Sequence, residues 1–143
     1  MGWAKPAYNP MIQIADMKRL YPQFEYSINA HNLSSLTFSG KLAPHINMPD
    51  YFIRVTYRLG KSPRVKIIKP DLVEDPPHFY KKSNSLCLYR PDEFIWKKEY
   101  SIAKIIIPWV SSWIYFYEVW KETDVWYGEE AEHDINIEKI VND

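Results

Sequence analysis

Four segments in the first half of the chain alternate apolar and polar residues with a period of two. They lie within residues 24–30, 36–41, 51–59 and 65–67. Such alternation is typical of strands that bury one face and leave the other to water, and in the first segment it assigns Tyr26 to the apolar face. Because short connections separate the segments, the pattern favours an antiparallel meander of four strands.

Two helices are expected on either side of these strands in the sequence. Asn9-Pro10 favours a helix start and Tyr21-Pro22 a helix end, because proline suits a first turn and disfavours helical geometry in the residue before it. Apolar residues at helical spacing predict a longer helix, capped by Ser101 and kinked or broken at Pro108. They are Ile102, Ile105, Ile106, Trp109, Trp113, Phe116, Tyr117 and Trp120. This order of elements indicates an α+β fold in one domain spanning residues 1–143, with the major helix packed on one sheet face.

The stretch between the strands and the major helix, residues 69–89, is irregular and rich in proline, aspartate, serine and asparagine. Its prolines exclude a helix, and a long irregular segment in a small domain often carries function. It contains His78 and Cys87. Cys87 is the only cysteine, so no intramolecular disulfide can form, which favours a reducing compartment and predicts the cytoplasm. Taken alone, a cysteine between Leu86 and Leu88 is more often a small buried hydrophobe than a nucleophile.

Composition argues against several classes of ligand. The 18 basic and 18 acidic residues cancel, so the chain has no global electrostatic reason to bind nucleic acid or anionic lipid. The four glycines are isolated and form no phosphate-binding loop, and the single cysteine and four histidines lack zinc-type spacing. The apolar stretch at 102–120 contains charged residues and reads as a core helix instead of a membrane span. We therefore expect no cofactor, no metal, no nucleic acid and no membrane partner.

The order of these features resembles the ubiquitin-conjugating enzymes (E2 enzymes). In that family a helix and a four-stranded meander are followed by a proline-rich segment, His-Pro-Asn, a cysteine between apolar residues, a tryptophan and a helix. This chain has Pro76-Pro77-His78, then Leu86-Cys87-Leu88, then Trp96, and its helix opens at Ser101. The aromatic run downstream, from Ile107 to His133, is similar to a bacterial branch found in anti-phage defence operons of the CBASS type. The resemblance implies the ubiquitin-conjugating-enzyme fold with an active-site loop that carries the cysteine.

The same resemblance supplies candidate site residues. Cys87 corresponds to the catalytic cysteine, and His78 to a histidine that chiefly braces the loop, although it could also act as a general base. The Pro-Asn of the family motif is replaced by Phe79-Tyr80, so the oxyanion or loop support given by the family asparagine is assigned to Asn84 or Tyr80. His133, in an acidic tail, is a further candidate for approaching the cysteine.

The implied activity is acyl transfer. Cys87 would form a thioester with the C-terminal glycine of a donor protein and pass it to a lysine amine of an acceptor. In CBASS systems such proteins act on a cGAS-like nucleotidyltransferase, which is the expected partner. The chain has no nucleotide site with which to activate the donor, so a separate activating enzyme is also expected. Two alternatives remain: a non-catalytic binding module of the same fold, and a cysteine hydrolase that uses Cys87 with His78 or His133.

Overall fold

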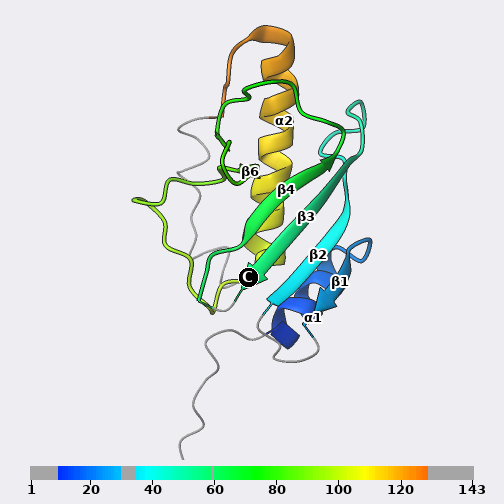
Figure 1. Cartoon of the computed structure of the whole chain (residues 1–143). Coiled ribbons are helices and arrows are strands. Elements are labelled where there is room, and N and C mark those ends of the chain that lie inside the picture. Colours follow the sequence, from blue (N-terminus) through cyan, green and yellow to red (C-terminus); the bar gives the residue numbers. More distant parts are fainter. Residues whose placement is uncertain (1–9, 30–34, 59, 129–143) are drawn as a thin grey trace, which may run out of the picture.

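The fold is an antiparallel sheet with one long helix packed across it. The computed structural model describes residues 10–29, 35–58 and 60–128. Helix α1 (Pro10–Leu20) is followed by strands β1 (Glu25–Ile28), β2 (Ser35–Leu42), β3 (Tyr51–Arg58) and β4 (Arg64–Lys69), which pair in the order β1-β2-β3-β4. A two-stranded hairpin, β5 (Phe79–Tyr80) and β6 (Ser85–Leu86), comes next, and then the helical segments η1 (Ile102–Ile106) and α2 (Ile107–Thr123). Figure 1 shows α2 behind the sheet, with α1 at the β1 end. The α+β fold predicted from the sequence is confirmed.

The core lies between the sheet and α2, where the predicted alternation of β3 is confirmed. Tyr51, Ile53, Val55 and Tyr57 are buried, whereas Phe52, Arg54 and Arg58 are exposed. From the helix, residues such as Trp113 and Tyr117 are buried against this face. A sheet with one covered and one wet face requires this period of two, so the pattern in the sequence sets which side α2 can cover.

Strand β1 follows the alternation only in part. Tyr26 lies opposite the buried Phe38 and so on the predicted apolar face, but it is 45% exposed. β1 is an edge strand paired only with β2, and the Tyr26 ring lies under the Lys18 ammonium of α1, 5.3 Å from its centroid. Phe24, just before the strand, is buried instead and packs on Gly40 of β2, where a Cβ atom would lie 2.5 Å from the phenyl ring. The missing side chain at Gly40 therefore makes room for Phe24.

The major helix changes its hydrogen-bond pattern just before Pro108. η1 is a π-helical turn, in which the N–H of Ile107 donates to the carbonyl of Ile102, and α2 begins with Pro108 in its first turn. Ser101 caps this segment as predicted, because its hydroxyl accepts from the backbone N–H of Lys104. The expected interruption at Pro108 thus takes the form of a π turn before α2. Proline has no backbone N–H to donate, and this turn places it at the start of the α-helix, where a donor is not needed.

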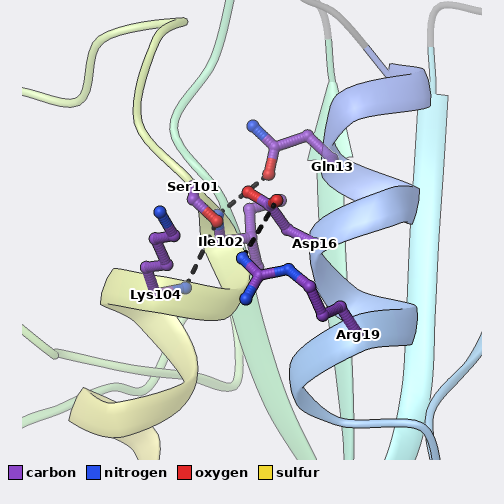
Figure 2. A network of polar contacts seen from close by, with 6 residues as sticks. All are labelled: Gln13, Asp16, Arg19, Ser101, Ile102 and Lys104. Atoms are coloured by element: carbon purple, nitrogen blue, oxygen red, sulfur yellow. Dashed lines mark hydrogen bonds and ion pairs between the residues drawn. The ribbon is translucent and has the colours of Figure 1, made fainter. Parts of the chain in front are cut away.

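Helix α1 is joined to the start of η1 by one buried side chain (Figure 2). Gln13 is 2% exposed; its Oε1 accepts from the N–H of Ile102 at 2.9 Å and its Nε2 donates to the carbonyl of Tyr100 at 2.7 Å. The amide therefore satisfies a helix N-terminal donor that burial would otherwise leave without a partner. The predicted helix start at Pro10 and end before Tyr21 are confirmed, while the capping residue Asn9 lies outside the described residues.

Two further polar contacts position α2. The Tyr51 hydroxyl donates to the Glu118 carboxylate, and the Tyr117 hydroxyl accepts from the N–H of Val73 at 2.8 Å. The first contact ties β3 to α2, and the second ties the irregular segment after β4 to the same helix. Because these bonds lie in a part-buried environment, their loss would leave polar groups poorly solvated.

Candidate functional site

The predicted site lies on a short hairpin that the sequence pattern did not reveal. β5 and β6 pair antiparallel with Phe79 opposite Leu86 and Tyr80 opposite Ser85. Asn84 closes the turn with a positive φ of 52°, a left-handed conformation that asparagine tolerates better than most residues, and its N–H donates to the carbonyl of Lys81 at 3.3 Å. Strands of two residues are too short to show any periodicity, so residues 69–89 looked structureless.

Cys87 directly follows β6 and continues the pairing of the hairpin. Its N–H donates to the carbonyl of His78 at 2.9 Å, on the residue that precedes β5. The cysteine is free and half-buried, and its Sγ lies 3.4 Å from the Tyr80 hydroxyl and 3.5 Å from the Tyr89 carbonyl oxygen. The sulfur is therefore held at hydrogen-bonding distance from two oxygens while part of the residue stays in contact with solvent.

The position of Tyr80 follows from the hairpin register. Tyr80 lies opposite Ser85, and Cys87 comes two residues later on the same face. Such diagonal neighbours are separated by about 7–8 Å between backbones, which an aromatic side chain can span. The hydrogen bond with Cys87 and burial raise the pKa of Tyr80 to about 12. Of the two residues predicted to replace the family asparagine, the structure brings Tyr80 to the sulfur.

His78 supports this arrangement through its backbone. Its φ of 52° is uncommon for a residue with a side chain, and its carbonyl accepts two N–H groups, from Cys87 and from Trp113 Nε1, both at 2.9 Å. The imidazole packs on Trp126, with 4.9 Å between the ring centroids. The two hydrogen bonds that this carbonyl accepts explain how the unusual backbone conformation of His78 is held. These contacts fit the loop-bracing role implied for His78.

Three further aromatic residues belong to this site, and the sequence analysis assigned none of them a site role. Trp113 was expected only as a core residue, Trp126 lies beyond the helix, and Tyr89 provides a carbonyl next to the sulfur. Trp113 and Trp126 also pack on each other, with their ring centroids 5.6 Å apart. No local signal identifies them, because each meets the hairpin through contacts distant in sequence.

Asn84 makes no contact with the sulfur among the described residues. Asn84 is exposed at the hairpin turn and lines a hollow that also contains Asp71, Glu74 and Asp75, on a different set of residues from those around Cys87. His133 lies outside the described residues, so its predicted approach to the cysteine stays a prediction.

A groove opens beside the cysteine. Its volume is about 810 Å³, within the ~300–1,000 Å³ common for binding pockets, and it extends between the β3–β4 turn, the hairpin and the segment before η1. Tyr80 and Tyr89, the two residues that contact the sulfur, both line it. Leu86 and Leu88 also line the groove whereas Cys87 does not, so the sulfur lies next to the groove through its contacts with Tyr80 and Tyr89.

Among the described residues, no group of three histidine, cysteine or acidic side chains is arranged to hold a metal ion. Within the same ranges, no helix combines the length and the apolar character needed to cross a membrane.

Comparison with known protein families finds a match for this chain. Residues 13–134, well over half of the chain, match the family described as E2-CBASS, Type II CBASS E2 protein. This range includes the hairpin, the cysteine and both helical segments of the core. A search of curated proteins finds no match.

Proposed function

Because the chain belongs to the Type II CBASS E2 protein family, and so has an E2-like role in CBASS defence, we propose that Cys87 carries the C-terminus of a donor protein as a thioester. The thioester is then passed to a lysine amine of an acceptor. The observation that carries this proposal is the half-buried free sulfur beside the Tyr80 hydroxyl, at the edge of the groove. The donor we propose is a protein ending in glycine, the cGAS-like nucleotidyltransferase of the same defence system, activated by a separate enzyme.

In the first step the Cys87 thiolate attacks the activated carbonyl carbon of the donor's terminal glycine. A carbon–sulfur bond forms, the activating group leaves, and the thiol proton goes to solvent. Thiolate suits this step because it is a strong nucleophile and because the thioester remains reactive towards amines. The oxygen of the tetrahedral intermediate gains negative charge and needs a nearby hydrogen-bond donor.

Tyr80 is the proposed donor for that oxygen. Its hydroxyl lies 3.4 Å from the sulfur. The Cys87 S–H donates to the oxygen of this hydroxyl, so the phenol O–H itself is free to donate to the carbonyl oxygen as negative charge develops on it. Loss of one such donor in other enzymes reduces rates by about 10²–10³-fold when the donor is buried and rigid. Tyr80 is 44% exposed, so we expect a smaller factor here.

In the second step a lysine amine attacks the thioester carbonyl. The amide bond forms, Cys87 leaves as thiolate, and the amine proton is lost to solvent. The rigid support of the hairpin matters at this stage, because a misplaced acyl carbon would lower the fraction of productive encounters. The bond from Trp113 to the His78 carbonyl, together with the bond from Cys87, provides this support.

The test is direct because the chain has one cysteine, so every thiol adduct is on Cys87. The protein is mixed with a donor ending in a glycine thioester and examined by intact mass and non-reducing gel. We expect an adduct that thiols remove, an oxyester with Cys87→Ser that thiols do not remove, and no adduct with Cys87→Ala. A stable non-covalent complex without any adduct would favour the binding module. Cleavage of the donor conjugate by wild type but not by Cys87→Ala would favour the hydrolase.

A further inference from the structure

The groove beside Cys87 is lined by positively charged side chains, which the composition of the chain does not suggest. The whole chain is neutral, yet four cations line the groove and none of its described lining residues carries a carboxylate. The cations are Lys61, Arg64, Lys82 and Lys98. They come from the β3–β4 turn, the start of β4, the hairpin turn and the segment before η1, so the fold itself gathers them.

These four side chains are exposed, and none of them forms an ion pair with a carboxylate in the part of the chain that the structure describes. The neighbouring cation Lys81, by contrast, contacts Asp75 at 2.5 Å on the other side of the hairpin. Like charges gathered in a groove attract anions more strongly than the same charges spread over a surface. The groove is therefore an anion-attracting surface within reach of the sulfur.

Two of the aromatic side chains of the groove, Trp96 and Phe94, offer no open face for stacking a base. Trp96 packs edge-on against Tyr57 and Tyr100, with interplanar angles of 78° and 81°, and its Nε1 donates to the Tyr57 hydroxyl. Phe94 is packed in the same way against Tyr89. Base recognition by stacking needs an open ring face, whereas these rings mostly contact one another. An anionic peptide needs only the cations and the apolar walls.

We propose that this groove binds an acidic segment of the acceptor protein, one in which Asp or Glu residues flank the lysine to be modified. This inference rests on the proposed function of Cys87. The donor is held covalently on the sulfur during transfer, whereas the acceptor has only non-covalent contacts to bring its amine to the thioester. Charge complementarity between the groove and carboxylates near the target lysine would raise its local concentration there. Ile95, 74% exposed on the groove wall, offers an apolar contact to the same segment.

The test measures peptide binding separately from thioester formation and acyl transfer. The probe is a fluorescein-labelled peptide of alternating Glu and Gly around one central Lys, with a matched peptide that has Gln in place of Glu. Anisotropy is measured with Cys87→Ala protein, which cannot form a thioester, so failure of the proposed chemistry does not affect this readout. We expect the Glu peptide to bind more tightly than the Gln peptide, and added salt to weaken its binding.

The variant that tests the groove is the double change Lys61→Glu and Lys82→Glu, made in the same background. Two attractions become repulsions, so we expect affinity for the Glu peptide to fall by about tenfold, since each exposed pair contributes a few-fold. The matched control changes Arg54 and Lys66 to Glu, an exposed cross-strand pair outside the groove with the same change in net charge. We expect less than about a twofold loss from it at moderate salt.

Equal binding of the Glu and Gln peptides would overturn the proposal, as would an equal loss of affinity in the groove and control variants. Tighter binding of ATP than of the Glu peptide, with ATP displacing it, would assign the groove to a nucleotide instead. A second readout is transfer from donor-charged wild-type protein to the lysine of each unlabelled peptide. We expect faster transfer to the Glu peptide, an advantage that the Lys61→Glu/Lys82→Glu change removes. If no thioester forms while the binding pattern holds, the proposed function fails and the acidic-peptide groove stands.

Discussion

The indole N–H of Trp113 offers the sharpest test of how the helix supports the active-site hairpin. Trp113→Phe removes the donor to the His78 carbonyl and keeps an aromatic ring in a side-chain position that is only 3% exposed. The same carbonyl still accepts from Cys87, so it is not left without a partner. The substitution should therefore loosen the hairpin without unfolding the sheet.

The expected magnitude comes from two contributions. One hydrogen bond in a part-buried site is worth about 0.5–1.5 kcal/mol. The smaller ring also leaves a void against Tyr117, which stacks on Trp113 at 5.2 Å, and against Trp126 at 5.6 Å, adding roughly 1 kcal/mol. We expect the free energy of unfolding to fall by about 2 kcal/mol and thioester transfer to slow by roughly tenfold, because about 1.4 kcal/mol of lost positioning corresponds to that factor.

Hydrogen exchange by mass spectrometry checks the mechanism, because the Cys87 amide donates to the same carbonyl. Exchange in peptides covering residues 79–88 should become faster in Trp113→Phe. Trp120→Phe is the matched control: Trp120 also packs on Tyr117 from α2, and its described ring contact is with that residue alone. Unchanged exchange in the hairpin, or equal acceleration in both variants, would refute the role assigned to the Trp113 indole.

Three other outcomes are expected. Tyr80→Phe should fold as wild type, since Tyr80 is 44% exposed, but slow acyl transfer from Cys87 by roughly tenfold in single-turnover assays; an unaltered rate would remove Tyr80 from the mechanism. Gly40→Ala should lower the free energy of unfolding by about 1–3 kcal/mol in urea titrations, because its Cβ would lie 2.5 Å from the Phe24 ring, and an unchanged midpoint would contradict this packing. Burial and the bond to a carboxylate raise the pKa of Tyr51, so the folded state holds that proton more tightly than the unfolded chain does. The stabilisation of the folded state by this group is fully present below pH 10 and declines as the pH rises above that value. Tyr51→Phe should therefore make the melting temperature less sensitive to pH in that range.

The sequence predicted the elements whose periodicity extends over several residues. The alternation through β3 and the helical spacing from Ile102 to Trp120 each repeat often enough to define a buried face. Both faces are buried as expected, except that Phe116 and Trp120 are only half-buried. Tyr26 lies on the predicted face yet stays 45% exposed, because β1 is at the edge of the sheet and the alternation of one segment does not show which strand will lie there.

The sequence nominated Cys87 and His78 as site residues, which stay predictions, and it did not reveal the residues that surround them. The contact between Trp113 and His78 spans 35 residues, and that between His78 and Trp126 spans 48, so no local pattern encodes either one. The hairpin was missed for a different reason: its two strands are two residues each, and its stability comes from the turn at Asn84 and from the tertiary bonds to the His78 carbonyl. Sequence patterns report local periodicity, whereas this site is assembled by contacts between distant segments.

The hairpin geometry also explains how Tyr80, which we propose takes the role implied for the family asparagine, comes next to the sulfur. Phe79 and Leu86 form the pair next to Tyr80 and Ser85, so strand alternation puts Tyr80, Ser85 and Cys87 on one face. The sulfur lies on a diagonal to Tyr80, a span of about 7–8 Å between backbones that a short amide side chain would not cover. A phenol reaches it, and the Tyr80 oxygen lies 3.4 Å from the sulfur. A polar group that approaches Cys87 from this position of the hairpin has to be long, which supports the proposal that Tyr80 takes over the role implied for the family asparagine.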